Sequence, residues 1–128
     1  MKTSNFLLFL AIYGFITGGM MLFNAGGSLV NFGVQPIDQY HIVILQYLGL
    51  TDIALSLIVF LLRNEQSSTV IKSLLITYLF ITIGSFLKAC YGVFLQNVPS
   101  NTFFWVDMSF RVLVGLVCVF FLLKTTKK

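Results

Sequence analysis

Four ionisable side chains interrupt long apolar stretches of this sequence: Asp52, Lys88, Asp107 and Arg111. A charge at the centre of a bilayer costs about 2.5–3.5 kcal/mol on insertion scales, so such residues usually face one another or a polar cavity. The four formal charges cancel, because two of the residues are acids and two are bases. Groups of this kind can hold a ligand, an ion or a proton, or they can form ion pairs that only stabilise the helices.

Four apolar segments must carry these residues. The chain has 128 residues, of which 58% are hydrophobic and 9% charged, whereas soluble domains carry about 25% charged residues. We therefore expect an all-α protein, a polytopic membrane protein folded as one four-helix bundle, since about 20 apolar residues cross a bilayer as a helix. Polar and glycine-rich breaks place the helices at about residues 5–23, 41–62, 70–96 and 103–123.

The two ends of the expected bundle differ in charge. The bases near the ends of the helices all fall on one side, and they are Lys2, Arg63, Lys72, Lys124, Lys127 and Lys128. The positive-inside rule then places both termini in the cytoplasm, and we expect a bacterial inner membrane protein in contact with membrane lipid. The basic residues at the cytoplasmic ends of the helices account for the net charge of +4. No basic cluster with interleaved aromatic residues suggests nucleic acid as a partner.

The helical periodicity of the sequence predicts that the four ionisable residues face one another. A helix rises 1.5 Å per residue, so all four lie in the outer half of the membrane or at its centre. Each helix also has a face of small or polar residues that can turn inward. We predict one pocket that opens outward. Five side chains are expected to line it as ligand-binding residues: Asp52, Lys88, Tyr91, Asp107 and Arg111.

Structural ion pairs give an alternative interpretation. Asp107 and Arg111 are four residues apart on one helical face and can neutralise one another. Asp52 and Lys88 could form an interhelical pair that fixes the order of the helices. Sequence alone leaves the structural and functional interpretations open.

The remaining notable residues do not indicate a catalytic or metal site. The only histidine, His41, stands at a helix start near the interface, and Cys90 and Cys118 differ in depth, so we expect free thiols. We expect no metal, haem or other cofactor. The Gly14-xxx-Gly18 pair predicts close helix packing. Residues 24–40 should connect two helices along the interface.

Three segments carry a family resemblance. They are Tyr13-Gly14-Phe15-Ile16-Thr17-Gly18-Gly19, Leu48-Gly49-Leu50-Thr51-Asp52 and Phe110-Arg111-Val112-Leu113-Val114-Gly115. In these segments and in its four-helix layout the chain resembles the small bacterial membrane proteins of the DoxX-like families. The resemblance implies the fold and carries over no site residues.

Three functions fit this pattern. The leading interpretation is binding of a small or lipid-like ligand in the outward pocket, with or without its transport. The second is a non-catalytic membrane subunit, with structural ion pairs and a surface for a partner subunit or another copy of the chain. The third is a membrane enzyme that acts on a lipid-soluble substrate, with Asp52 or Asp107 as the acid or base. Whether the chain is an enzyme stays open.

Overall fold

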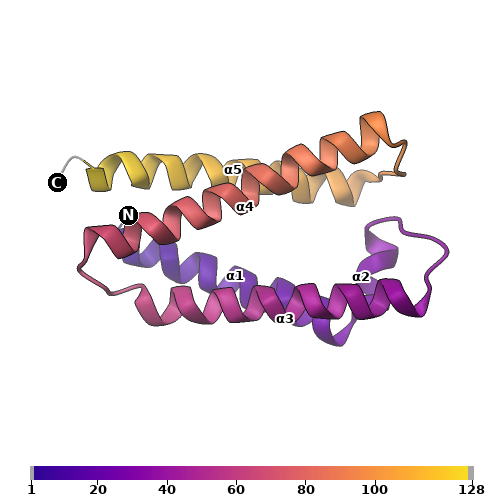
Figure 1. Cartoon of the computed structure of the whole chain (residues 1–128), viewed down its shortest axis with the longest axis horizontal. Helices are drawn as coiled ribbons and strands as arrows, with labels where there is room; N and C mark the ends of the chain where they lie inside the picture. The colour runs from indigo at the N-terminus through magenta and orange to yellow at the C-terminus, as the bar shows by residue number, and fades with distance from the viewer. Residues whose placement is uncertain (1, 127–128) are drawn as a thin grey trace. The chain divides into compact units, whose positions relative to one another are not determined.

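The computed structural model describes residues 2–126 and folds them into helices joined by turns (Figure 1). The long helices are α1 (Thr3–Phe23), α3 (Gln39–Leu62), α4 (Ser68–Leu95) and α5 (Thr102–Thr126), and α2 (Ala25–Asn31) is a short one. The four long helices are long and apolar enough to cross a membrane. They confirm the all-α class and indicate an integral membrane protein. Lys127 and Lys128, used above to predict orientation, lie outside the described residues.

Polar side chains set the ends of these helices. Asp38 caps α3, since its Oδ1 accepts a hydrogen bond from the backbone N–H of His41 at 2.9 Å. Asn101 caps α5 in the same way, with 2.9 Å from its Oδ1 to the backbone nitrogen of Phe104. After α4, Asn97 takes the left-handed conformation (φ 54°), which turns the chain out of the helix.

The connection between α1 and α3 contains a helix that the sequence analysis did not predict. Asn24 ends α1, and its backbone N–H donates to the carbonyl of Met20 at 2.9 Å. Residues 25–31 then form α2, which packs against α1 and α3. Ala25, Ser28 and Leu29 are buried. Their spacing of three and one places them on one helical face, so burial stabilises a helix where the glycines suggested a loop.

The chain divides into two compact units, Met1–Glu65 and Gln66–Lys128. We call them the first hairpin (α1, α2 and α3) and the second hairpin (α4 and α5). In the first hairpin α1 and α3 are antiparallel. At one end Ser4 Oγ donates to Asn64 Oδ1 at 2.7 Å, and toward the other end Gln46 Nε2 donates to the Leu22 carbonyl at 3.3 Å. The expectation of a single bundle stays a prediction.

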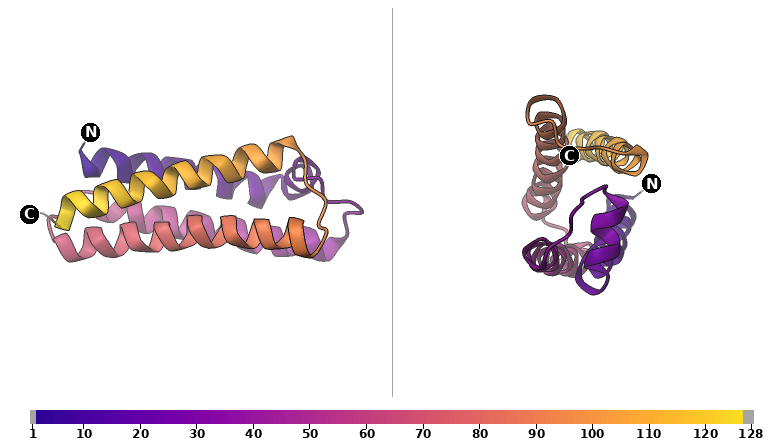
Figure 2. Two further views of the ribbon diagram at one scale, coloured as in Figure 1. Left: turned by 90° about the horizontal axis from the view of Figure 1, so that it is seen from above. Right: turned by 90° about the vertical axis from the view of Figure 1, so that its right-hand side faces the viewer.

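In the second hairpin α4 and α5 lie side by side and antiparallel (Figure 2). Near the turn that joins them, the rings of Phe94 and Trp105 are 6.0 Å apart. Further along, α5 approaches α4 closely at Gly115. A Cβ atom added there would lie 3.1 Å from Thr82 Oγ1.

Candidate functional site

Asp52 lies in the contact between α1 and α3, near the middle of α3. Its side chain is half-buried, and its Oδ2 accepts a hydrogen bond from Thr17 Oγ1 of α1 at 2.8 Å. This length is ordinary for a hydroxyl donor. A carboxyl group at this depth is therefore held by a neutral hydroxyl across the helix pair.

Glycines allow these short side chains to meet. A Cβ atom at Gly18 would lie 2.7 Å from the carbonyl oxygen of Gly49, and one at Gly49 would lie 2.7 Å from the carbonyl oxygen of Gly18. The two backbones are thus in direct contact. This confirms the close packing predicted for the Gly14-xxx-Gly18 pair, since small residues let membrane helices approach.

Ser56 extends the polar contact by one helical turn. Its side chain is fully buried, and its Oγ makes no hydrogen bond within residues 2–126. The hydroxyl packs directly against Gly14, at the place where a Cβ atom of that residue would stand. Buried hydroxyls normally have a hydrogen-bond partner, so this one calls for an explanation.

Asp107 and Arg111 form an ion pair on α5. Arg111 Nε donates to Asp107 Oδ2 at 2.8 Å, with side chains that are 22% and 15% exposed for Arg111 and Asp107. The spacing of four residues places both on one helical face, which is why the pair could be foreseen. Such a pair lowers the cost of both charges within a membrane-spanning helix.

Lys88 has different surroundings on α4. Its ammonium group lies 5.0 Å from the centre of the Tyr91 ring and makes a long hydrogen bond of 3.4 Å to Gln96 Oε1. Lys88 and Tyr91 are both exposed. No carboxylate lies within salt-bridge distance of Lys88 in the part of the chain that the structure describes. The positive charge is thus met by a ring and an amide alone.

The five predicted ligand-binding residues divide between the two hairpins. Asp52 belongs to the first, and the other four belong to the second. The structure brings Asp107 to Arg111 and Lys88 to Tyr91. One pocket shared by all five residues stays a prediction.

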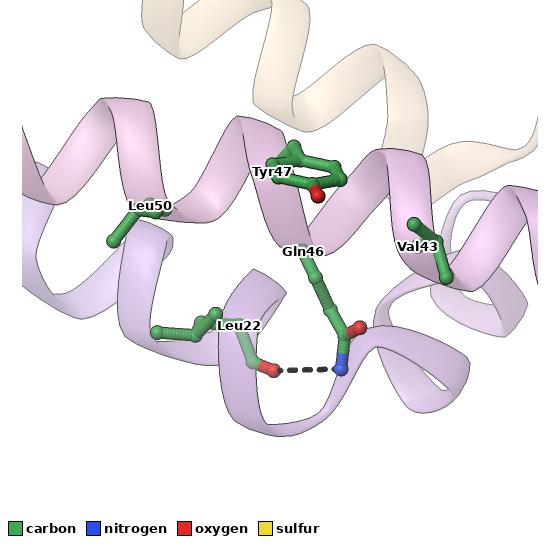
Figure 3. A pocket seen from close by; sticks show the side chains of 5 residues that line it. All are labelled: Leu22, Val43, Gln46, Tyr47 and Leu50. Atoms are coloured by element: carbon green, nitrogen blue, oxygen red, sulfur yellow. Dashed lines mark hydrogen bonds between the residues drawn. The ribbon is translucent and has the colours of Figure 1, made fainter.

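A shallow depression of about 220 Å³ lies on the first hairpin, beside the hydrogen bond from Gln46 to Leu22 (Figure 3). Its lining is formed by Leu22, Val43, Gln46, Tyr47 and Leu50. Sequence analysis did not single out Gln46, although an amide within an apolar helix is a recognisable signal. In the structure the Gln46 amide donates to the carbonyl of Leu22. This carbonyl lies in the last turn of α1, where carbonyl groups have no hydrogen-bond partner within their own helix.

The possible metal ligands and the two thiols of the chain are spread over several helices. Among residues 2–126 no three His, Cys, Asp or Glu side chains gather as metal ligands. Cys90 and Cys118 are free thiols, the former half-buried and the latter buried. Their positions do not suggest a site.

Comparison with protein-family models, with curated proteins and with solved structures finds no match.

Proposed function

We propose that this chain is a membrane protein that binds a small or lipid-like ligand with an anionic group, and that Lys88 holds that group. The proposal rests on the second hairpin alone. It places both termini in the cytoplasm of a bacterium and the second hairpin in the inner membrane. With this orientation Lys88, Asp107 and Arg111 occupy the outer half of the membrane.

The position of Lys88 carries the proposal. The residue stands seven positions before Leu95, the last residue of α4, which places its Cα about 10 Å inside the helix end. The side chain extends along Tyr91 toward Gln96. Long basic side chains extend in this way to bring their charge to the headgroup level. A cation at that level, without a carboxylate partner, suits the phosphate or carboxylate of a lipid-like ligand.

Arg111 can assist in the same half of the membrane. A guanidinium group has five N–H donors, and its Nε is the one that Asp107 takes. The other four make no hydrogen bond within the described residues. Together Lys88, Asp107 and Arg111 carry one net positive charge, which favours an anion over a neutral or cationic ligand.

Retention of phosphatidylglycerol by the purified full chain tests this proposal. Native mass spectrometry in detergent counts bound lipid as phosphatidylglycerol or phosphatidylcholine is added. The wild-type chain should bind phosphatidylglycerol more tightly. Lys88→Gln should weaken this binding about tenfold, because a hydrogen bond to a charged group contributes about 1.5 kcal/mol or more.

Two variants make the result specific. Lys88→Arg keeps the charge and should retain the lipid. Lys72→Gln makes the same chemical change near the other end of α4 and should have a much smaller effect. Equal losses in Lys72→Gln and Lys88→Gln, or equal binding of the two lipids by the wild-type chain, would contradict a specific anion site.

The Asp107–Arg111 pair favours a second candidate function, a non-catalytic membrane subunit whose charges are structural. The two groups already neutralise one another within one helix, so they need no ligand. In that case Lys88→Gln should leave phosphatidylglycerol binding unchanged. A copurifying subunit or a stable oligomer of this chain would then account for its role.

A further inference from the structure

Two polar groups in the depression on the first hairpin have unused hydrogen-bonding capacity. The Gln46 amide donates one N–H to the Leu22 carbonyl at 3.3 Å, and Figure 3 shows its oxygen on the side away from that carbonyl. Neither this oxygen nor the Tyr47 hydroxyl makes a hydrogen bond within residues 2–126. The depression therefore offers an amide oxygen, which only accepts, and a hydroxyl group, which can donate.

Both groups lie well inside a helix that is long and apolar enough to cross a membrane. Gln46 and Tyr47 stand seven and eight residues after Gln39, the first residue of α3, which places their Cα atoms about 10–12 Å inside the helix end. Bulk water does not hydrate polar groups at this depth, so an unused acceptor costs free energy until a donor reaches it. A charged headgroup stays at the membrane surface, whereas an uncharged hydroxyl group can enter to this level.

The depression suits one end of a longer, uncharged molecule. Its other lining residues are Leu22, Val43 and Leu50, and none of the five side chains is charged. Pockets that enclose a whole small ligand usually have about 300–1,000 Å³, whereas this depression is shallow and has about 220 Å³. Hydrocarbon chains that continue from a group bound here stay in the surrounding lipid.

Close packing of α1 against α3 forms the site before any ligand arrives. A Cβ atom at Gly49 would lie 2.8 Å from the backbone nitrogen of Leu22, so the two helices touch beside the depression. The Gln46 amide is held to α1 at the same place by its hydrogen bond to Leu22. Binding then needs little ordering of the protein, which favours affinity.

We propose that this depression binds an uncharged lipid that has a free hydroxyl group close to an ester carbonyl, which is the chemistry of a diacylglycerol. The lipid hydroxyl donates its hydrogen to Gln46 Oε1, and the ester carbonyl accepts from the Tyr47 hydroxyl. A lipid that has only acceptor oxygens leaves the amide oxygen unused. The site goes beyond the proposed binding of an anionic lipid, because it lies in the other hairpin and takes an uncharged ligand.

Photolabelling of the full chain in phosphatidylcholine vesicles tests the site, with a diacylglycerol that carries a diazirine in one acyl chain near the ester. Mass spectrometry of peptides should find the label concentrated in residues 43–50, and unlabelled diacylglycerol should compete for it. The same lipid with its hydroxyl converted to a methyl ether should compete about fivefold less well, because a hydrogen bond between uncharged groups contributes about 1 kcal/mol. Equal competition by the two lipids, or label spread evenly over the four long helices, overturns the proposal.

Matched variants separate the two hydrogen bonds. Gln46→Met should remove the preference for the alcohol over the ether, whereas Gln39→Met, at the exposed start of α3, should keep it. Tyr47→Phe should weaken binding of both lipids alike, since both have the ester carbonyl, and Tyr40→Phe, at another exposed tyrosine of α3, should not. An unchanged preference in Gln46→Met, or unchanged binding in Tyr47→Phe, overturns the proposal. Lys88→Gln should leave the labelling as it is, so this result is independent of the phosphatidylglycerol test.

Discussion

Replacing Gly18 with alanine should push α1 away from α3, because the two backbones touch at this residue. A Cβ atom there would lie 2.7 Å from the carbonyl oxygen of Gly49 and 3.1 Å from the backbone nitrogen of Ile53. Backbone atoms of a packed helix cannot rotate out of the way as the end of a side chain can. The adjacent Gly19 provides a matched control, since nothing lies within 4 Å of a Cβ atom added there.

The size of the effect follows from these distances. An ordinary contact begins at 3.4 Å, so the helices must separate by about 0.7 Å. The same movement would stretch the 2.8 Å bond from Thr17 to Asp52 beyond the ~3.0 Å limit of a good hydrogen bond from a hydroxyl group. Overpacking costs about 1–3 kcal/mol and the weakened bond about 1.5 kcal/mol, whereas alanine in a helix gains about 0.5–1 kcal/mol over glycine.

We therefore expect Gly18→Ala to lower the free energy of unfolding by about 1.5–4 kcal/mol. Gly19→Ala should leave it unchanged or raise it by up to ~1 kcal/mol. Unfolding of the full chain by SDS in mixed micelles, followed by circular dichroism, measures both variants. If the two variants are equally stable, the direct backbone contact between α1 and α3 is refuted.

Gly14→Ala should cost less than Gly18→Ala, because the three atoms nearest to the added methyl group belong to the side chains of Ser56 and Asp52 and not to the backbone, and Ser56→Ala should restore its stability. Absence of rescue in the SDS assay would contradict this packing. Arg111→Ala should lower stability by about 3 kcal/mol by leaving a buried charge, and adding Asp107→Ala should recover part of the loss. Strictly additive losses in thermal unfolding would show that the pair does not interact. Finally, a reporter fused to the C-terminus should indicate the cytoplasm, and one in the turn between α4 and α5 the opposite side. Matching signals would contradict the orientation.

Hydropathy predicted the four long helices but not where they begin. Thr3, Gln39, Ser68 and Thr102 open them, one or two residues before the starts expected at 5, 41, 70 and 103. The reason is that an apolar run marks the part of a helix that needs lipid, whereas the first turn is often made of polar residues whose N–H groups are still capped or solvated. Similarly, α5 continues past the apolar run, through Lys124, to Thr126.

A polar contact within the apolar helices could be predicted from the sequence only where both residues lie in the same helix. The Asp107–Arg111 pair needs only one helix, so the spacing of four residues was sufficient to foresee it. The bond from Thr17 to Asp52 joins residues that are 35 apart. It depends on how far α1 slides along α3, which neither helix encodes alone, and sequence analysis proposed other partners for Asp52.

The contact between Gly18 and Gly49 fixes the position of α1 along α3. Gly18 and Gly49 can touch in only one register of the two helices, and Thr17 and Asp52 each lie within three residues of that contact. Threonine and aspartate side chains are short, so they reach one another only where the backbones are this close. The packing contact and the polar contact are therefore one structural feature. A substitution that separates the backbones should weaken helix association and the hydrogen bond from Thr17 to Asp52 together, whereas Thr17→Val should remove that hydrogen bond with little change in packing.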